Sequence, residues 1–329
     1  MERDLKFLAG FVIAMVATSV ILIGTSPLSI GEGDDSSEFP DFITKNEDYF
    51  ITRIGGVPEI DRDTYRLEVT GLIDNPKNFT LDELQSLDLI ELPLTVECIG
   101  NPENGPLIGT AVWKGFNMFD LLESLGLSEN ATAVTYRAAD SYFASHTLDQ
   151  LKNNGVIGAL YMNGVEIPPV QGFPLRILNP GYYGAKQPAW VTSIEVKNTS
   201  LQDLWDNQGW DTSQPIEIDS HIFFPDDEFV TIGVNENLRL GGCAFGGTRV
   251  KFVEYSIDYG FTWNQASIVQ QMDADNVWVF WEINIRFNST DQVVLQVKAT
   301  DINNNQQQKT DFNYLDGTSS WPHLTITVV

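Results

Sequence analysis

The sequence predicts an α+β domain with mixed sheets, followed by a β-sandwich and preceded by one transmembrane helix. Three observations lead to this fold class. Between residues 46 and 212, short strand patterns and short helix patterns alternate irregularly, without the regular repeat of a doubly wound fold. From residue 213 to residue 329, strand patterns follow one another without a helix signal. Near the N-terminus, the run Phe7–Gly24 contains no charged residue.

The uncharged run Phe7–Gly24 is long enough to span a bilayer, because its 18 residues would extend about 27 Å as a helix. Arg3 and Lys6 precede it and acidic residues follow it, so the positive-inside rule predicts a cytoplasmic N-terminus with the rest of the chain outside. A cleaved signal peptide is the alternative. Because no Ala-x-Ala site follows the run, we expect residues 1–24 to be an uncleaved anchor. Residues 25–45 are rich in Ser, Gly, Asp and Glu and are expected to form a solvated acidic linker.

The chain is strongly acidic. Its 45 acidic and 19 basic residues give a formal net charge of −26. This balance argues against nucleic-acid binding, which requires a basic surface. Three explanations stay open: a salt-adapted surface, an extracellular protein from a lineage with acidic surfaces, or electrostatic steering of a basic redox partner.

The elements expected between residues 46 and 212 follow from capping signals and apolar periodicity. A capping box at Thr80-Leu-Asp-Glu83 opens one short helix, and Thr147 is expected to cap a second. The apolar face of Met118–Leu125 predicts a third helix, which Gly126 ends. The expected strands are Tyr65–Gly71, Leu92–Val96, Ala133–Arg137, Leu175–Leu178 and Val191–Val196, with a hairpin over Ala159–Val165 that turns at Asn163-Gly164.

The part from residue 213 onward is predicted to consist of strands alone. Five or more strands over about 115 residues, separated by turns such as Asp258-Tyr-Gly260, indicate a β-sandwich. The strand candidates are Val230–Leu238, Arg249–Asp258, Val277–Phe287, Gln292–Thr300 and Leu324–Val329.

Only two cysteines occur, Cys98 and Cys243. Cys98 ends an apolar run just before a Gly-Asn turn, where a thiol is well placed to bind a soft metal. A small buried hydrophobic side chain is the alternative interpretation, and it is the preferred one for Cys243. No Cys-x-x-Cys-His motif for covalent haem and no paired cysteine motif for zinc or iron–sulfur clusters occurs in the sequence. We therefore expect one metal-ligating cysteine and no disulfide.

Several motifs in order give this chain a resemblance to a known family. They are Cys98-Ile-Gly-Asn, then Leu107–Gly115, then Gly172–Lys186, and together they resemble the sulfite oxidase family of molybdopterin enzymes, in its broad prokaryotic branch. The resemblance extends from about residue 50 to the C-terminus. It implies that Cys98 binds molybdenum through its thiolate, with tungsten as the alternative metal. The segment from Gly241 to Trp263 resembles the immunoglobulin-like dimerisation domain that follows the catalytic domain in this family.

The resemblance also implies roles for charged residues. Cys98 and Arg53 are the two residues expected to act in catalysis. Arg53 matches an arginine beside the metal that would hold an oxyanion substrate. A surface charge at a strand edge is the alternative. Asp140 matches an aspartate that contacts the pterin, although an aspartate that stabilises a turn is equally consistent. Arg176 matches the arginine at the cofactor phosphate, and a charge within an apolar run needs such a partner.

Three further cofactor contacts are expected where the residue types depart from the family pattern. Gln171 stands where a histidine is usual at the phosphate, and its amide can still donate a hydrogen bond. Lys186 stands where an arginine is usual, and it keeps the charge but lacks the planar fork. Gln187 begins a segment that replaces a His-x-Lys sequence. The dipeptide Ile54-Gly55 replaces an Asn-His pair that helps to hold the pterin.

Two departures concern the substrate. Vertebrate-type sulfite oxidases have arginines after their Cys-Ala-Gly-Asn turn, whereas Pro102-Glu103 follows it here. A carboxylate beside the metal would repel sulfite, unless Glu103 pairs with Lys114 or points to solvent. The catalytic tyrosine of those enzymes falls at Trp210, for which packing between domains is the preferred interpretation.

Together these features predict a molybdopterin-dependent oxidoreductase that is anchored in the membrane and works outside the cytoplasm. It would carry out two-electron oxygen-atom transfer on a small S- or N-oxo substrate. Because no haem motif occurs, it would exchange electrons with a separate carrier such as a cytochrome or cupredoxin, and its last domain suggests a homodimer. The alternatives are sulfite oxidation itself and a non-catalytic surface protein that retains a degenerate fold.

Overall fold

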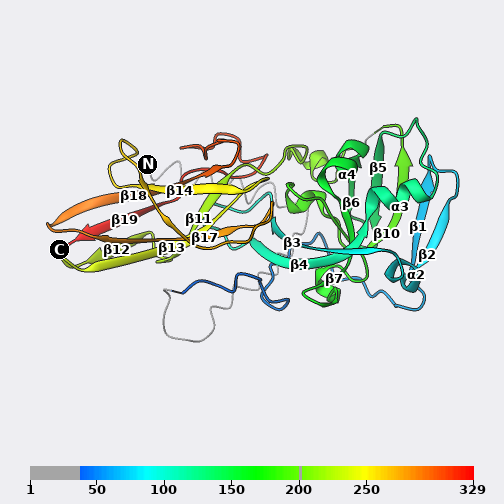
Figure 1. Cartoon of the computed structure of the whole chain (residues 1–329), viewed down its shortest axis with the longest axis horizontal. Coiled ribbons are helices and arrows are strands. Elements are labelled where there is room, and N and C mark those ends of the chain that lie inside the picture. The colour runs from blue at the N-terminus through cyan, green and yellow to red at the C-terminus, as the bar shows by residue number, and fades with distance from the viewer. Residues whose placement is uncertain (1–37, 200–201) are drawn as a thin grey trace.

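The computed structural model describes residues 38–199 and 202–329, so the predicted anchor over residues 1–24 lies outside the described residues. The described part is elongated, and two lobes follow one another along its longest axis (Figure 1). The chain up to residue 199 builds the first lobe, and the chain from residue 219 onward builds the second. Within these described ranges, no helix is both long enough and apolar enough to cross a membrane.

One sheet of the first lobe is mixed, as the sequence predicts. Strand β1 (Arg66–Gly71) runs parallel to β10 (Val191–Lys197), and the remaining neighbours are antiparallel. Side chains that alternate along these strands, such as Leu67, Val69 and Ile194, lie in the main hydrophobic core of the lobe. The strand order is β2 (Lys77–Thr80), β1, β10, β5 (Ala133–Ala138) and β6 (Phe143–Thr147).

The second sheet of the first lobe carries the Cys98 turn. Its strands are β3 (Leu89–Glu97), β4 (Ile108–Asn117), β7 (Ile157–Met162) and β8 (Val165–Glu166), and β9 (Arg176–Leu178) pairs with β7. The predicted hairpin forms between β7 and β8, and Asn163 and Gly164 adopt the positive φ values of 51° and 82° that such a turn requires. Because β3 ends at Glu97, Cys98 leaves the sheet on the following turn.

Three short α-helices accompany these sheets in the part of the chain that the structure describes: α2 (Leu81–Gln85), α3 (Met118–Ser124) and α4 (Leu148–Asn154). The capping box at Thr80 and Glu83 forms as predicted, and Thr147 forms a second one with Gln150. Gly126, with φ of 78°, follows α3 where the sequence predicts its end. Single turns of 3-10 helix occur at η1 (Pro169–Gln171), η2 (Gly184–Lys186) and η3 (Asp206–Gln208).

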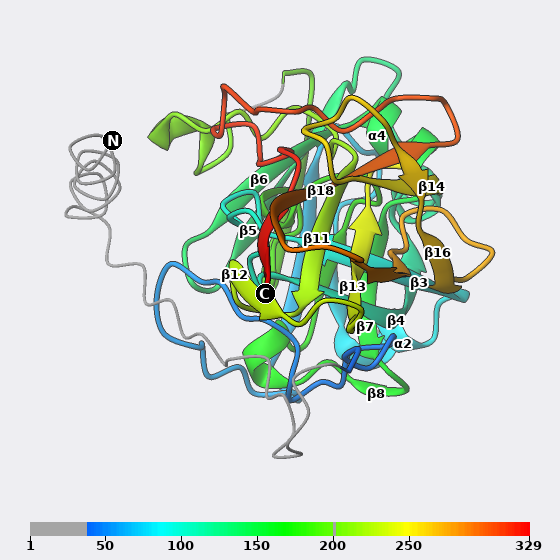
Figure 2. The ribbon, with the colours of Figure 1, turned by 90° about the vertical axis from the view of Figure 1, so that its left-hand side faces the viewer.

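The second lobe is a sandwich of two sheets, which Figure 2 faces from its free end near the C-terminus. The inner faces meet in a core that includes Leu240, Trp281, Leu295 and Ile326. The first sheet has the order β11 (Asp219–Phe224), β13 (Asn237–Phe245), β17 (Val279–Arg286) and β16 (Ser267–Gln270). The second has the order β12 (Phe229–Ile232), β19 (His323–Val328), β18 (Asp291–Asp301), β14 (Val250–Ser256) and β15 (Asn264–Gln265).

The prediction of a single strand over Val230–Leu238 is wrong. The chain turns between β12 and β13, and these two strands belong to different sheets. Asn235 has a φ of 65° in this turn, and the carboxylate of Glu236 accepts a hydrogen bond from the N–H of Gly233 at 2.7 Å. Turn chemistry therefore overrides an apolar alternation that continues through it.

The described end of the predicted linker also departs from expectation, because residues 39–44 pack on both lobes. The indole N–H of Trp278, in the second lobe, donates to the carbonyl of Phe42 at 3.0 Å. The N–H of Thr44 donates to the carbonyl of Thr110, on β4 of the first lobe, at 2.8 Å. Aromatic burial outweighs the acidic composition of this stretch.

Candidate functional site

Cys98 lies on a tight turn that the buried side chain of Asn101 holds in place. The N–H of Cys98 donates to the carbonyl of Leu107, and the N–H of Asn101 donates to the carbonyl of Cys98, each at 2.9 Å. The Oδ1 atom of Asn101 accepts from the N–H of Leu107 at 2.9 Å, and its Nδ2 donates to Oε1 of Glu97 at 2.9 Å. The asparagine of the Cys-Ile-Gly-Asn motif thus fixes the turn that presents the thiol.

The sulfur of Cys98 has two hydrogen-bond donors beside it, the Gly100 N–H and the Thr52 side chain. Burial raises the pKa of the Cys98 thiol to about 11, and hydrogen bonds from the Gly100 N–H and the Thr52 side chain act in the opposite direction. Gly184 packs against the same turn, because a Cβ atom there would lie 3.4 Å from the carbonyl oxygen of Glu97 and 4.0 Å from Cα of Cys98. A coordinated metal deprotonates a thiol, and these two donors would then stabilise the thiolate.

Two guanidinium groups of the site have no acidic partner among the described residues. Arg53 directly follows Thr52, and its buried Nε has no hydrogen-bond partner. Arg176 on β9 donates from Nη1 to the carbonyl of Gln171 at 3.2 Å, while its buried Nε also lacks a partner. Its guanidinium lies 5.4 Å from the ring centre of Trp113. Burial lowers the pKa of Arg176. A buried cation without a counter-ion is costly, so both arginines are suited to bind anions.

Asp140 lies on the turn between β5 and β6. Its Oδ1 accepts a hydrogen bond from the N–H of Tyr142 at 2.9 Å, and Ser141 between them has a φ of 73°. The carboxylate therefore stabilises the turn, which was the alternative interpretation of this residue. Burial raises the pKa of Asp140. Its contact with the pterin stays a prediction.

Tyr142 is a site residue that the sequence analysis missed. Its hydroxyl donates to the carbonyl of Ala185 at 2.7 Å. Burial raises the pKa of Tyr142 well above its usual value, and the nearby acidic groups of Asp203, Cys98 and Asp140 add to this shift. The phenol therefore joins the Asp140 turn to the segment that contains Ala185. The only signal in the sequence that could have identified Tyr142 is its position two residues after Asp140, a candidate pterin ligand.

Lys186 is held by the protein itself. Its Nζ forms a buried ion pair with Oδ2 of Asp203 at 2.5 Å and donates to the carbonyl of Ser145 at 3.0 Å. The Asp203 carboxylate also accepts from the N–H of Ser145 at 2.6 Å. A lysine suits this arrangement, because one compact ammonium serves both acceptors. A further contact from Lys186 to the cofactor stays a prediction.

The two glutamines behave differently. Gln171 is buried, and its Nε2 donates to the carbonyl of Tyr49 at 3.0 Å, so its amide donor has a structural role. Gln187 donates from Nε2 to the carbonyl of Tyr182 at 2.7 Å, but its buried Oε1 has no partner. Gln187 therefore keeps an acceptor that a ring N–H of a pterin could use.

Several unpartnered polar atoms of the first lobe test whether the residues present fit molybdopterin. Buried polar groups in folded proteins almost always have hydrogen-bond partners. Donors that can hold a phosphate and an acceptor that can hold a pterin edge are both present, so the residues fit this group. The unpartnered atoms include Nε of Arg53 and Arg176, the indole N–H of Trp113, Nδ2 of Asn179 and Oε1 of Gln187.

Comparison with known proteins agrees with this geometry. Residues 54–205 match the family model of the oxidoreductase molybdopterin binding domain, and residues 211–328 match that of the Mo-co oxidoreductase dimerisation domain. The chain belongs to the sulfite oxidase family of molybdopterin-dependent oxidoreductases.

Relatives in this family include both sulfite oxidases and nitrate reductases. Sulfite oxidase of Arabidopsis thaliana is 26% identical over 79% of this chain and 81% of its own length. Mitochondrial sulfite oxidase of Macaca fascicularis is 29% identical over 74% of this chain and 53% of its own length. The NADH nitrate reductase of Volvox carteri is 28% identical over 80% of this chain but 37% of its own length. The chain thus spans only part of the longer relatives.

A solved structure shows the same fold. It is the sulfane dehydrogenase SoxCD from Paracoccus pantotrophus, which superposes with a TM-score of 0.78 at 19% identity. The match covers 92% of this chain and 86% of that chain. The mixed-sheet lobe and the sandwich are therefore the expected architecture of a sulfite oxidase family member.

In this sulfite oxidase family member, Glu103 contacts two residues near the C-terminus. Its Oε1 lies 3.2 Å from Nδ1 of His323, and its Oε2 accepts from the hydroxyl of Ser320 at 3.1 Å. Both partners belong to the second lobe. The carboxylate therefore joins the two lobes, and its repulsion of sulfite stays a prediction. Lys114, the other partner considered, lies instead over the ring of Tyr161 at 6.0 Å.

Trp210 packs between the lobes, as preferred from the sequence. Its indole would lie 3.4 Å from a Cβ atom at Gly100, in the Cys98 turn. It joins an apolar cluster with Ile99, Tyr183 and Trp278. The position therefore shapes the turn through packing.

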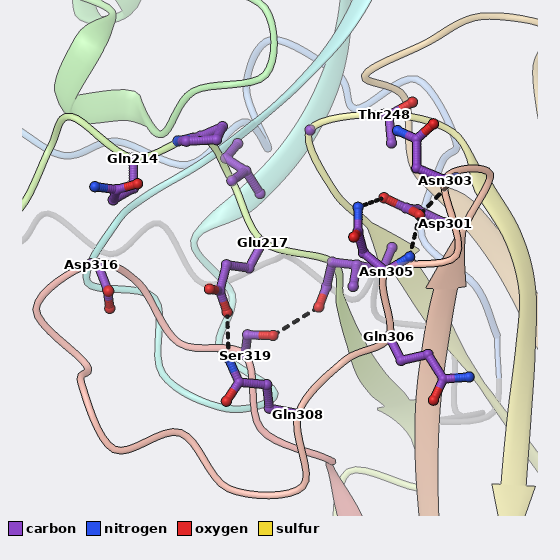
Figure 3. Close-up of a pocket in the computed structure, with 14 residues that line it drawn as sticks. Gln214, Glu217, Thr248, Asp301, Asn303, Asn305, Gln306, Gln308, Asp316 and Ser319 are labelled. Carbon is purple, nitrogen blue, oxygen red and sulfur yellow. Dashed lines mark hydrogen bonds between the residues drawn. The ribbon is translucent and has the colours of Figure 1, made fainter.

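A polar cavity of about 560 Å³ lies elsewhere, where residues 214–218 meet loops of the second lobe (Figure 3). Glu217, Asp301 and Asp316 are among its lining residues, and Glu217 accepts a hydrogen bond from Gln308 at 3.4 Å. None of the residues predicted to hold the cofactor lines it. Its acidic lining is also unsuited to a phosphate, so it is not the cofactor site.

Proposed function

We propose that this chain carries out two-electron oxygen-atom transfer on a small S- or N-oxo substrate outside the cytoplasm, with a molybdopterin cofactor. The observation that carries the proposal is the Cys98 turn, where a thiol with two hydrogen-bond donors lies next in space to the Thr52-Arg53 segment. When bound, the metal centre supplies the oxygen-atom transfer, while the protein positions it and tunes its surroundings.

Each side chain of the site has a defined task in this proposal. Cys98 would bind the metal as a thiolate, which suits a soft centre. Arg176 would pair with the cofactor phosphate, with the indole N–H of Trp113 as a second donor. The free Oε1 of Gln187 would accept a hydrogen bond from the pterin. Arg53 would orient a negatively charged oxygen of the substrate.

The charges around Arg53 favour an anionic substrate. The one carboxylate expected to oppose this, that of Glu103, is engaged by His323 and Ser320, whereas Arg53 keeps a buried N–H without a partner. Sulfite oxidation is therefore a second candidate function that this observation supports. The names of several relatives, sulfite oxidase and sulfane dehydrogenase, refer to sulfur substrates.

The electron partner, assembly and location are proposed on separate grounds. No haem or paired-cysteine motif occurs in the sequence, so a separate cytochrome or cupredoxin would exchange the electrons, and the net charge of −26 would steer a basic carrier. The match to a dimerisation domain supports a homodimer. The run Phe7–Gly24 supports an anchor with both lobes outside. Protease added to intact cells should then degrade both lobes, and complete protection would reverse this topology.

The catalytic proposal is tested with the purified full-length chain. Molybdenum, tungsten and pterin are measured per chain, and sulfite, thiosulfate, dimethyl sulfoxide and trimethylamine N-oxide are assayed with artificial electron dyes. Cys98→Ser should abolish turnover while circular dichroism stays unchanged, because a hydroxyl is a poor ligand for a soft metal. A chain with neither metal nor pterin would instead support the non-catalytic alternative.

Arg53→Gln separates the substrate classes. Loss of a charge-assisted hydrogen bond should raise KM for sulfite about 10-fold or more and leave KM for a neutral oxide unchanged. Arg137→Gln, at an exposed position on β5, is the matched control. Equal effects of Arg53→Gln on both substrate classes would remove the proposed role of Arg53.

A further inference from the structure

Three buried ionisable side chains from the two lobes meet directly beside the Cys98 turn. Glu97 is the last residue of β3, while Asp219 and His221 lie on the same face of β11. Nε2 of His221 lies 3.2 Å from Oε1 of Glu97 and 3.3 Å from Oδ2 of Asp219. The three side chains are 1%, 3% and 5% exposed for His221, Glu97 and Asp219. We call them the interlobe triad.

The spacing within the interlobe triad matches metal coordination. Zinc bonds to nitrogen and oxygen of about 2.0–2.1 Å, arranged tetrahedrally, place neighbouring ligand atoms about 3.3 Å apart. The two measured separations have this length, and all three ligand atoms lie within 4.8 Å of one another. The measured separations are therefore compatible with one ion shared by the three side chains.

Charge and hydrogen bonding also point to a cation. No lysine or arginine among the described residues pairs with Glu97 or Asp219, so two buried carboxylates face a single imidazole. Neutral donors orient both carboxylates, as donors around metal ligands commonly do: Asn101 donates to Glu97 at 2.9 Å, and Gln307 donates to Asp219. The Oε2 atom of Glu97 is buried and has no partner at all, and it leaves this carboxylate free to bind through both oxygens.

Cys243 lies beside the interlobe triad and is the candidate for a fourth ligand. It lies on β13 directly opposite His221 in the ladder between β11 and β13, so the two side chains share a face. Its thiol is free and fully buried. Burial raises the pKa of the Cys243 thiol, and the charges of Glu97 and Asp219 add to the shift.

We propose that Glu97, Asp219 and His221, with Cys243 beside them, form a second metal site for a divalent first-row transition ion of the zinc type. Imidazole and thiolate select such an ion over calcium or magnesium, which bind six or more oxygens. The site joins the lobes and anchors the residue before Cys98. It is independent of the proposed catalytic function, because none of its ligands is a predicted ligand of the molybdopterin. The competing arrangement is a protonated His221 that bridges the two carboxylates without metal.

Elemental analysis of the full-length chain tests the proposal, with Zn²⁺ alone as the probe. After incubation with zinc and dialysis, the wild type should retain about one zinc per chain, and Asp219→Asn and His221→Gln should each lose at least about 90% of it. His323→Gln, at an exposed histidine, should retain it. Molybdenum measured in the same samples reports the catalytic cofactor separately. A wild type that retains no zinc overturns the proposal and supports the protonated bridge.

Cobalt gives a readout that does not depend on comparing folded variants. Wild-type protein loaded with Co²⁺ should show the intense visible bands of a tetrahedral site and a thiolate-to-cobalt charge-transfer band. Cys243→Val should lose only the charge-transfer band. Absence of tetrahedral bands in the wild type overturns the site, and an unchanged charge-transfer band in Cys243→Val removes the cysteine from it.

Discussion

The ammonium group of Lys186 and the carboxylate of Asp203 form a buried ion pair, with Nζ 2.5 Å from Oδ2. Asp203 is fully buried and Lys186 nearly so. Lys186 follows Gly184, which packs against the Cys98 turn, and Asp203 lies in the connection between the lobes. The ion pair therefore links these two segments. Burial raises the pKa of Asp203, while the charge of Lys186 opposes that shift.

Removing one charge of this pair should destabilise the fold. Asp203→Asn keeps an acceptor for Ser145 but leaves a buried ammonium unpaired, so we expect a loss of about 3–5 kcal/mol in the free energy of unfolding. Adding Lys186→Met to Asp203→Asn should recover most of it, because the unpaired charge is gone. Urea unfolding measures both. Asp273→Asn, in an ion pair with Arg249 where Asp273 is 94% exposed, should change stability by about 1 kcal/mol or less.

Arg176 should have opposite effects on the protein with and without its cofactor. Arg176→Met keeps apolar contact with Trp113 but removes a buried charge that lacks a counter-ion. We expect the cofactor-free protein to unfold at an equal or higher urea concentration and the molybdenum content per chain to fall about 10-fold or more. Arg176→Lys should keep an intermediate content. Unchanged molybdenum in Arg176→Met would mean that the phosphate lies elsewhere.

Glu103 should affect the junction between the lobes and leave substrate binding unchanged. Its carboxylate contacts His323 and Ser320, which are partly exposed. Glu103→Gln should therefore change stability by about 1 kcal/mol or less and leave KM for sulfite the same. A large fall in KM for sulfite would show that the carboxylate does act on the substrate.

Local signals in the sequence predicted most of the first lobe. The capping boxes at Thr80 and Thr147 and the turn at Asn163-Gly164 depend on residues close in the chain, and all three formed. The strand over Val230–Leu238 failed because an apolar alternation does not reveal where the chain changes sheets. Local pattern carries no information about which sheet a strand joins.

The candidate site was predictable only where the family motif names a residue. Cys98 lies on a tight turn and Arg176 has a buried Nε without a partner, while their roles toward the cofactor stay predictions. The partners of Glu103, Lys186 and Tyr142 could not be predicted, because each contact joins positions at least 17 residues apart in the chain. The separations range from Lys186–Asp203 to Glu103–His323. Long-range contacts of this kind have no periodic signature.

His146 should make the protein sensitive to acid. Its ring is buried, its Nε2 lies 2.7 Å from the carbonyl of Lys186, and its Nδ1 has no partner, which fits a neutral ring that donates from Nε2. Burial, with a smaller effect of the Lys186 charge, lowers the pKa of His146 from 6.5 to about 3. The unfolded chain therefore binds a proton below pH 6.5 that the folded protein takes up only near pH 3.

The stabilising contribution of a neutral His146 is therefore complete above pH 6.5 and is lost as the pH falls towards 3. The free energy of unfolding should drop by up to about 1.4 kcal/mol per pH unit in this range, or about 2–3 kcal/mol between pH 6.5 and 4.5. The buried carboxyl groups with raised pKa values, such as Asp140 and Asp203, act in the opposite sense. The contributions of these carboxyl groups cancel when the wild type is compared with a variant that retains them.

His146→Gln keeps an amide donor for the carbonyl of Lys186 and cannot titrate. The free energy of unfolding of the wild type minus that of His146→Gln should therefore become more negative as the pH falls. A difference between wild type and His146→Gln that stays constant from pH 7 to 4.5 would mean that His146 is charged in the folded protein.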